Sequence, residues 1–319
     1  MVAGGQNIAY YHNEANRNGN VITISASGAY SGFINYFDNP IFASDCNTLR
    51  SKQEEKIPTK LLFHLLKSIQ QEIYGLQRGQ AQPHVYGEDI ANIKIPLPSK
   101  DIQQKIVEEI QHIEEECFFN QSKIDRLNNN IDNVLNNING EFISLEQIAP
   151  YVVDSIKLED ININTYITTD NMLQNKLGIV PFSGEPNITS ITKYQQEDIL
   201  ISNIRPYLKK IWFSDISGGC SKDVLVFRSL NVSDYLPKYI FYLLRRDSFF
   251  DYIMTEKKGV KMPRGNKDQI LKYRLPIIAP NDQRKVISEI EKLEQQIDIA
   301  QESIHKSTYQ KAAILKKYL

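Results

Sequence analysis

The apolar residues of this chain follow two alternating patterns. Short runs rich in β-branched and aromatic side chains predict strands at 21–25, 32–37, 198–202 and 224–228. Apolar residues at helical spacing follow Pro58 and Pro237, and they predict helices over 61–74 and 239–254. The same succession of strands and helices is therefore expected in each half of the chain.

A further short apolar run in each half, at 93–97 and 272–278, predicts one more strand. Two long segments follow, 101–139 and 282–319, whose apolar residues step by three and four. The stripe is narrow, which is typical of a coiled coil rather than of a helix with a broad core-facing side. At ~1.5 Å per residue, each helix would be roughly 60 Å long. We expect the two helices to pair antiparallel; the alternative is that each packs on its own half.

The chain contains an internal repeat. Residues 78–110 align without a gap with residues 258–290, at a shift of 180 positions, and the match continues upstream at a shift of 177 to 178. Identical pairs include Gly79 with Gly259, Pro83 with Pro263, Gln103 with Gln283 and Asp45 with Asp223. A repeat of this length fixes the architecture. The chain is interpreted as a tandem duplication.

The second repeat begins near Glu141, well before its match to the first begins. The first repeat is therefore expected to lack its opening segment. Either the chain is shortened at that point or a partner supplies the piece.

The predicted fold is α+β, with two similar α/β domains separated by two long antiparallel coiled-coil helices in a pseudo-twofold arrangement. The first domain covers 1–98 and the first helix 99–140. The second domain covers 141–280 and the second helix 281–319.

Composition adds several exclusions. With 41% apolar and 24% charged residues, the chain has the composition of a folded, soluble protein. No apolar run approaches the ~20 residues of a membrane span, and the three scattered cysteines fit a reducing cytosol. We found no methyl-donor loop, phosphate-binding loop or nuclease signature. A cytoplasmic protein with no catalytic residues, no metal and no cofactor is expected.

The net charge of −1 is unevenly distributed. Between positions 193 and 274 there are 16 Lys and Arg against 9 Asp and Glu, whereas 101–118 carries six acidic residues and one lysine. Basic side chains of the second repeat would contact the phosphates of a nucleic acid. The alternative is an ordinary solvated basic surface.

The glycine–proline loops around Gly79 and Gly259 are the best candidates for contact with DNA. The first loop offers Arg78, Gln80, Gln82, His84 and Tyr86. The second offers Lys257, Lys258, Lys261, Arg264, Asn266 and Lys267. A further cluster in the second repeat contains Arg205, Tyr207 and Lys209. Amide side chains pair with adenine and cationic ones with guanine, so a shared framework with different polar side chains predicts two different DNA sequences. The alternatives are loop drift after duplication and, for Tyr207, a packing role.

Two sequence blocks match a known family. They are the proline–glutamine–helix pattern at 95–110, repeated at 275–290, and the block SNIRPYLKKIWFSDISGGCSKDVLVFRS at 202–229. In both, the chain resembles the specificity subunits of type I restriction–modification systems. The resemblance covers essentially the whole chain.

The resemblance implies two target-recognition domains, each of which reads half of a split double-stranded DNA site. It implies that the long helices set the spacing and dock two DNA methyltransferase (modification) subunits, which use S-adenosylmethionine, and that separate restriction subunits hydrolyse ATP and cut. The chain itself would be a non-catalytic subunit. The alternatives are the C-terminal recognition region of a fused restriction–modification enzyme and a coiled-coil scaffold that does not bind DNA.

Overall fold

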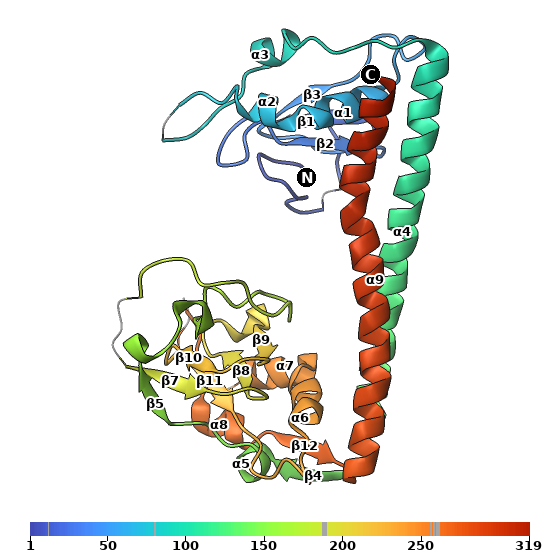
Figure 1. Ribbon diagram of the computed structural model, residues 1–319. Coiled ribbons are helices and arrows are strands. Elements are labelled where there is room, and N and C mark those ends of the chain that lie inside the picture. The colour runs from blue at the N-terminus through green and yellow to red at the C-terminus, as the bar shows by residue number, and fades with distance from the viewer. Residues whose placement is uncertain (12, 80, 187–189, 256, 258, 260–261) are drawn as a thin grey trace. The chain divides into compact units, whose positions relative to one another are not determined.

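The computed structural model describes residues 1–319 apart from 12, 80, 187–189, 256, 258 and 260–261. The chain divides into two compact units (Figure 1). Unit 1 contains Met1–Lys123 with Ile299–Leu319, and unit 2 contains Ile124–Asp298. This division cuts both long helices, whereas the four segments expected from the sequence keep each helix whole. Those segment boundaries stay a prediction.

Unit 1 is built on a three-stranded antiparallel sheet. Its strands are β1 (Val21–Ser25), β2 (Ile34–Phe37) and β3 (Cys46–Leu49), in the order β2-β1-β3. All five residues of β1 are buried, because the strand lies between two others and carries Ile22 and Ile24 into the core. The strands predicted at 21–25 and 32–37 are confirmed.

The helices of unit 1 that follow the sheet are α1 (Thr59–Ser68), α2 (Gln70–Tyr74) and α3 (Gly87–Ala91). The single helix predicted over 61–74 is wrong, since it is interrupted at Ile69. The Ser68 hydroxyl donates to the Leu65 carbonyl at 2.7 Å, and a serine that bonds to its own helix backbone weakens the helical ladder there.

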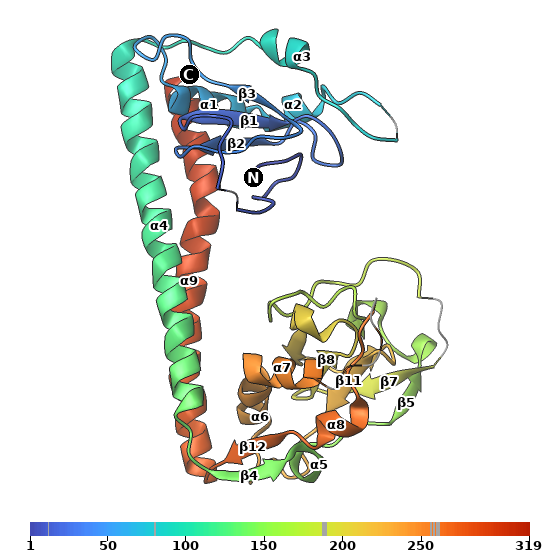
Figure 2. The same cartoon turned by 180° about the vertical axis from the view of Figure 1, so that it is seen from behind.

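The long helices are α4 (Lys100–Asn136) and α9 (Pro280–Tyr318). In unit 1 the portion of α4 up to Lys123 lies beside the portion of α9 from Ile299 onward (Figure 2). Cross-helix bonds join Glu109 to Lys317 at 2.9 Å, Glu114 to Lys311 at 3.2 Å and Asn120 to Ser303 at 3.1 Å. Residue numbers rise along one helix as they fall along the other, so the two portions run in opposite directions.

The apolar face of α1 packs against these portions of the long helices. Leu61 and Leu65 contact a cluster that contains Ile106 and Ile110 of α4 and Leu315 of α9. The alternative from the sequence was that each long helix packs on its own half. Within unit 1, α4 contacts α1 of its own half, whereas α9, which follows the second half in the chain, contacts the same cluster.

Unit 2 holds more strands than unit 1. Its sheets have the strand orders β11-β8-β9, β5-β7-β10-β6 and β12-β4. The strands are β4 (Glu141–Ser144), β5 (Ser155–Lys157), β6 (Tyr166–Ile167), β7 (Ser190–Tyr194), β8 (Ile199–Ser202), β9 (Ile211–Phe213), β10 (Gly218–Cys220), β11 (Val224–Phe227) and β12 (Arg274–Ile277). The strands predicted at 198–202, 224–228 and 272–278 are confirmed.

The α-helices of unit 2, besides its portions of α4 and α9, are α5 (Leu145–Ile148), α6 (Pro237–Leu244), α7 (Asp247–Thr255) and α8 (Lys267–Leu271). Short 3-10 turns lie at η1 (Leu158–Asp160), η2 (Ile163–Thr165) and η3 (Pro206–Leu208). The single helix predicted over 239–254 is wrong, because α6 ends at Leu244 and Asp247 starts a new helix. Arg245, at the break, forms an ion pair with Glu294 of α9.

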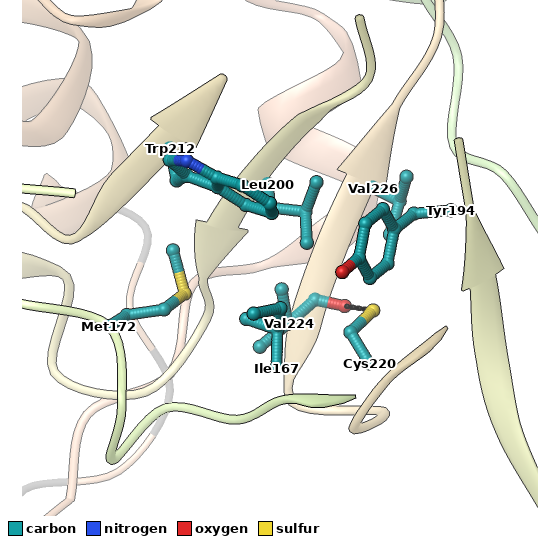
Figure 3. Close-up of a cluster of buried hydrophobic side chains, with 8 residues drawn as sticks. All are labelled: Ile167, Met172, Tyr194, Leu200, Trp212, Cys220, Val224 and Val226. Atoms are coloured by element: carbon teal, nitrogen blue, oxygen red, sulfur yellow. Dashed lines mark hydrogen bonds between the residues drawn. The ribbon is translucent and has the colours of Figure 1, made fainter. Parts of the chain in front are cut away.

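A buried apolar cluster joins two of these sheets. Tyr194 of β7, Leu200 of β8 and Trp212 of β9 pack with Cys220, Val224 and Val226 (Figure 3). The Tyr194 and Trp212 rings meet edge to face, with centroids 5.8 Å apart. This core holds the strand ends from which the loops of unit 2 emerge.

The two units share an element order. The order β9-β8-β11 in unit 2 matches β2-β1-β3 in unit 1, and α6, α7 and α8 follow as α1, α2 and α3 do. One expected strand is missing: residues 93–97 form no strand, although their counterpart β12 does. β12 pairs with β4, but no strand lies beside 93–97 in the described part of the chain.

The repeated glutamine, Gln103 in unit 1 and Gln283 in unit 2, connects the globular part to the start of the long helix by hydrogen bonds. The Gln283 side chain is fully buried; it accepts a bond from the Leu236 N–H at 2.9 Å and donates to the Ile278 carbonyl at 2.8 Å. In unit 1 the Gln103 amide donates to the Pro98 carbonyl at 2.9 Å. The proline–glutamine pattern thus fixes how each globular part joins its helix. Within the described ranges, no helix combines the length and apolar character that crossing a membrane requires.

Candidate nucleic-acid interface

The loop around Gly79 in unit 1 is fixed by backbone hydrogen bonds. Arg78 and His84 exchange two of them, at 2.9 and 2.8 Å. The Gly28 N–H, just beyond β1, donates to the Pro83 carbonyl at 3.0 Å. The loop is therefore held against the end of the central strand, where its side chains are presented from a rigid base.

The loop around Gly259 in unit 2 is fixed in the same way. The Arg205 N–H donates to the Pro263 carbonyl at 2.7 Å. The internal repeat aligns Arg205 with Gly28 and Pro263 with Pro83, so one backbone bond recurs at matched positions. This bond also brings the cluster around Arg205 next to the cluster around Arg264, which the sequence had left as separate candidates.

The shared glycines have a conformational role. Gly79 and Gly259 have φ values of +98° and +85°, in the region that other residues avoid. A Cβ on Gly79 would also lie 2.9 Å from the Gln82 carbonyl oxygen. The glycine therefore belongs to the framework that shapes the loop, and so does the proline, whose carbonyl accepts the shared backbone bond.

The loop after β8 carries backbone strain that its counterpart in unit 1 does not. Arg205 and Lys209 both have φ of +50°, whereas the matched positions in unit 1 are Gly28 and Gly32, with φ of +83° and +89°. A left-handed conformation costs a non-glycine residue roughly 1–2 kcal/mol. Strain of this kind is concentrated at functional sites. Unit 2 thus holds an arginine and a lysine where the backbone conformation favours glycine.

The side chains of the unit 1 loop form a stack. The Arg78 guanidinium donates to the Asp89 carboxylate and lies 5.8 Å from the centre of the Tyr86 ring. The His84 ring stacks on Tyr86, with centroids 6.2 Å apart and planes 19° apart. Tyr86 is 47% exposed. Unit 1 therefore presents a flat aromatic–guanidinium surface with few charges.

The side chains of the unit 2 loop form a cationic surface. Arg264 lies 3.2 Å from the Asp223 carboxylate, and both side chains are about half exposed. An exposed pair of this kind contributes little to stability, so the guanidinium can exchange partners. Lys257 and Lys267 are exposed as well. Tyr207, beside Arg205, is 49% exposed.

Lys209 differs from its neighbours because its charge is already paired. Its ammonium lies 3.0 Å from the Asp247 carboxylate, which also binds Lys176 at 2.6 Å. Burial tends to raise the pKa of Asp247, but the two lysines outweigh it and hold the pKa below its usual value. Lys209 therefore anchors the loop.

Comparison with known proteins matches part of this chain to a family. Residues 4–129 match the family described as "Type I restriction modification DNA specificity domain". The matched residues, which are less than half of the chain, resemble a type I DNA specificity domain. The resemblance to type I specificity subunits that the sequence showed is thereby confirmed. The loop around Gly79 lies inside the matched residues, and the loop around Gly259 is related to it by the internal repeat.

Two solved structures have a similar fold. The S subunit of a type I restriction–modification system from M. genitalium superimposes with a TM-score of 0.56 at 18% identity, over 100% of this chain and 87% of that one. A chain from a type I R-M system, studied for complex assembly and conformational transition, gives a TM-score of 0.55 at 15% identity, over 94% and 82%. The HsdS subunit from Thermoanaerobacter tengcongensis gives 0.45 at 15% identity, over 95% and 81%. No curated protein matches the sequence.

The candidate residues of the specificity domain and its repeat fall into three groups. Those exposed on the two loop surfaces are Arg78, Gln82, Tyr86, Arg205, Tyr207, Lys257, Arg264 and Lys267, with His84 half-buried beside them. Lys209 and Asn266 are held by the fold: the Asn266 side chain caps α8 by accepting from the Asp268 N–H at 3.2 Å. Gln80, Lys258 and Lys261 lie outside the described residues.

Sequence reasoning missed the acidic partners of these loops. Asp89, Asp223 and Asp247 each hold a basic side chain of the candidate set. One signal was available, because the repeat aligns Asp223 with Asp45, which binds the Ser27 hydroxyl at 2.5 Å. The matched aspartates occupy the same place and hold different partners, as expected of a framework residue beside divergent side chains.

Proposed function

We propose that this chain is the non-catalytic DNA-recognition subunit of a type I restriction–modification complex, in which each unit reads one half of a bipartite double-stranded site. One observation carries the proposal. The loops around Gly79 and Gly259 are held by the same backbone bond, yet the first carries an aromatic–guanidinium stack and the second a set of exposed basic side chains. A duplicated framework with different side chains suits two different DNA sequences.

The chemistry of each surface supports a role in recognition. In unit 1 the Gln82 amide suits adenine and the Arg78 guanidinium suits guanine, both in the major groove. In unit 2 Arg205 and Arg264 suit guanine or phosphate, and Lys267 suits phosphate. We expect unit 2 to supply the larger share of salt-dependent affinity.

We further propose that α4 and α9 form an antiparallel coiled-coil spacer and dock two modification subunits, with restriction subunits joining that complex. In unit 1 these helices expose large apolar side chains to solvent. Phe118 is 76% exposed, and Phe119 and Ile299 are each 66% exposed. Phe118 and Phe119 are neighbours on α4, and large exposed apolar side chains of this kind support a protein-binding role.

The test is binding of the full chain to duplex DNA as salt is raised. A recognition subunit that neutralises several phosphates should lose affinity linearly on a log–log plot, with a slope of roughly −0.9 per phosphate. Arg205→Ala combined with Arg264→Ala should reduce this slope by about two. Arg284→Ala, on an exposed position of α9, is the control and should change nothing. No binding at low salt, as expected of a coiled-coil scaffold, would refute the proposal.

A further inference from the structure

The loop that follows the central strand carries a tyrosine at the same position in both units. The repeat aligns residues 26–33 with 203–210, and the one identical pair between these two segments is Tyr30 with Tyr207. Every other position of the loop differs, and the residue two positions before the tyrosine is glycine in unit 1 and arginine in unit 2. The tyrosine is therefore the side chain that the two loops have in common.

The backbone around the two tyrosines is also shared. In unit 1 the Ser25 N–H donates to the Phe33 carbonyl at 3.0 Å, and the matched bond in unit 2, from Ser202 to Lys210, is 3.1 Å long. Each tyrosine lies two positions after the residue whose N–H donates to the proline carbonyl. Both tyrosines therefore occupy matched positions next to the two glycine–proline loops.

Neither tyrosine packs in the core of its unit. Tyr30 is 47% exposed and Tyr207 is 49% exposed. Among the described residues, neither hydroxyl takes part in a hydrogen bond, and neither ring contacts another ring or a cation. Identical pairs in the adjoining strands, such as Ile24 with Ile201, are by contrast fully buried. A core-packing role therefore does not account for the shared tyrosine.

An exposed residue that both units share should contact a part of the DNA that both half-sites share. This step rests on the proposed function, in which the two units read different sequences. The base edges then differ between the half-sites, whereas the sugar–phosphate backbone is the same. A phenol hydroxyl is a hydrogen-bond donor, and tyrosine is among the side chains that donate to phosphate oxygens in protein–DNA complexes. The shared tyrosine therefore suits the backbone of the DNA rather than its bases.

We propose that Tyr30 and Tyr207 are matched phosphate contacts, in which each hydroxyl donates to a phosphate oxygen of the DNA backbone. Contacts to phosphate fix the register and orientation of a protein on the duplex without carrying sequence information directly. The side chains that differ between the units, such as Arg78 and Arg264, then meet the DNA from a framework that is positioned in the same way. One positioning contact thereby serves two different sequences.

The experiment measures the affinity of the full chain, as salt is raised, for a duplex that the chain selects from a random pool and for an unrelated duplex. Tyr30→Phe and Tyr207→Phe each remove one hydroxyl and keep the ring. Each should weaken binding to both duplexes by about tenfold, because one hydrogen bond to a charged group is lost. The slope of affinity against salt should stay unchanged, since a phenol is neutral, whereas Arg205→Ala should reduce it by about one.

Tyr309→Phe is the matched control for the loss of an exposed hydroxyl. Tyr309 lies on α9 and is 69% exposed, so this variant should keep the affinity of the unaltered chain for both duplexes. Thermal unfolding of all three variants should coincide with that of the unaltered chain, because each variant keeps its ring. A structural role for Tyr30 or Tyr207 would instead lower the unfolding temperature together with the affinity.

Three results would overturn the proposal and leave DNA recognition by the chain intact. The first is unchanged affinity in either phenylalanine variant. The second is a loss of affinity for the selected duplex alone, which would make the tyrosines base contacts. The third is a loss of thermal stability that accompanies the loss of affinity. If the unaltered chain binds neither duplex, the proposed function itself is wrong, and this inference fails with it.

Discussion

Units 1 and 2 share a backbone framework but carry different side chains on it. In both units, one backbone hydrogen bond to the proline carbonyl holds a glycine–proline loop at the end of the central strand. Where unit 1 has Gly28 and Gly32 in the left-handed region, unit 2 has Arg205 and Lys209. The comparison teaches that backbone bonds and glycine or proline positions carry the framework. The side chains placed upon it are free to diverge.

The largest expected difference between the units concerns a buried ion pair. Arg228 donates to both carboxylate oxygens of Asp198, at 2.8 and 2.7 Å, and the Asp198 side chain is 1% exposed. The repeat matches Arg228 with Arg50 and Asp198 with Val21. Unit 1 therefore has no carboxylate at the position of Asp198. Arg228→Ala should destabilise unit 2 by about 3–5 kcal/mol because it leaves a buried charge unpaired. Urea unfolding followed by amide exchange in each unit measures this loss.

Arg50→Ala is the matched control for that experiment. Arg50 is exposed, so its removal should change stability by no more than about 0.5 kcal/mol. Equal losses in the two variants would mean that the ion pair does not distinguish the units.

Acid should act on unit 1 through His64. Burial lowers the pKa of this histidine to about 4, although Glu114 lies 3.6 Å away. The folded state therefore keeps His64 neutral while the unfolded chain takes up a proton below about pH 6.5. Stability is fully present above that pH and falls as the pH drops toward 4. Between pH 7.5 and 5 the loss should be on the order of 2 kcal/mol.

The counterpart of His64 in unit 2 is Tyr242, whose pKa is raised by burial and by its bond to Glu294. It does not titrate in acid, so this position should not weaken unit 2. Replacing His64 by tyrosine should remove the acid sensitivity of unit 1, measured as amide exchange of core residues at the two pH values. A variant that loses the same stability on acidification would show that other groups cause it.

Matched positions before α3 and α8 should respond differently to alanine. Tyr86 stacks on the unit 1 loop, whereas Asn266 caps α8. Asn266→Ala should cost about 1 kcal/mol of stability in unit 2 and leave DNA affinity unchanged. Tyr86→Ala should weaken DNA binding by unit 1 with little loss of stability. Thermal unfolding and binding titrations on the same two proteins separate these effects.

The smallest effects concern the strained loop. Arg205→Gly should stabilise unit 2 by roughly 1 kcal/mol, since glycine relieves the left-handed strain, while it weakens DNA binding. Lys209→Gly also relieves strain but loses the ion pair with Asp247, so its net effect on stability should be near zero and DNA binding should be unchanged. A gain in stability without a loss of DNA affinity for Arg205→Gly would remove this residue from the interface.

Much of the fold was predictable because strong periodic patterns and the internal repeat both report it. The strands at 21–25 and 224–228 and the two long helices follow from local pattern alone. The failures have two causes, one tertiary and one local. Residues 93–97 look like a strand but have no described neighbour to pair with, and the helix predicted over 61–74 is interrupted beside Ser68, whose hydroxyl bonds within its own helix.

The candidate site was predictable in position but not in role. The repeat located both loops from Gly79 and Gly259. It could not show that Lys209 is neutralised by Asp247, because the two residues lie 38 positions apart in sequence. The acidic partners were missed for the same reason. The cap formed by Asn266 was missed because no helix was predicted to begin at Lys267.

The most direct test of the central claim is selection of duplex DNA from a random pool, first by the chain itself and then by a variant carrying Arg205→Ala and Arg264→Ala. The chain should select two short sequence tracts separated by a constant gap. The variant should keep one tract and lose preference in the other. A single tract, or the same change in both tracts, would contradict the account that two matched frameworks read two different sequences.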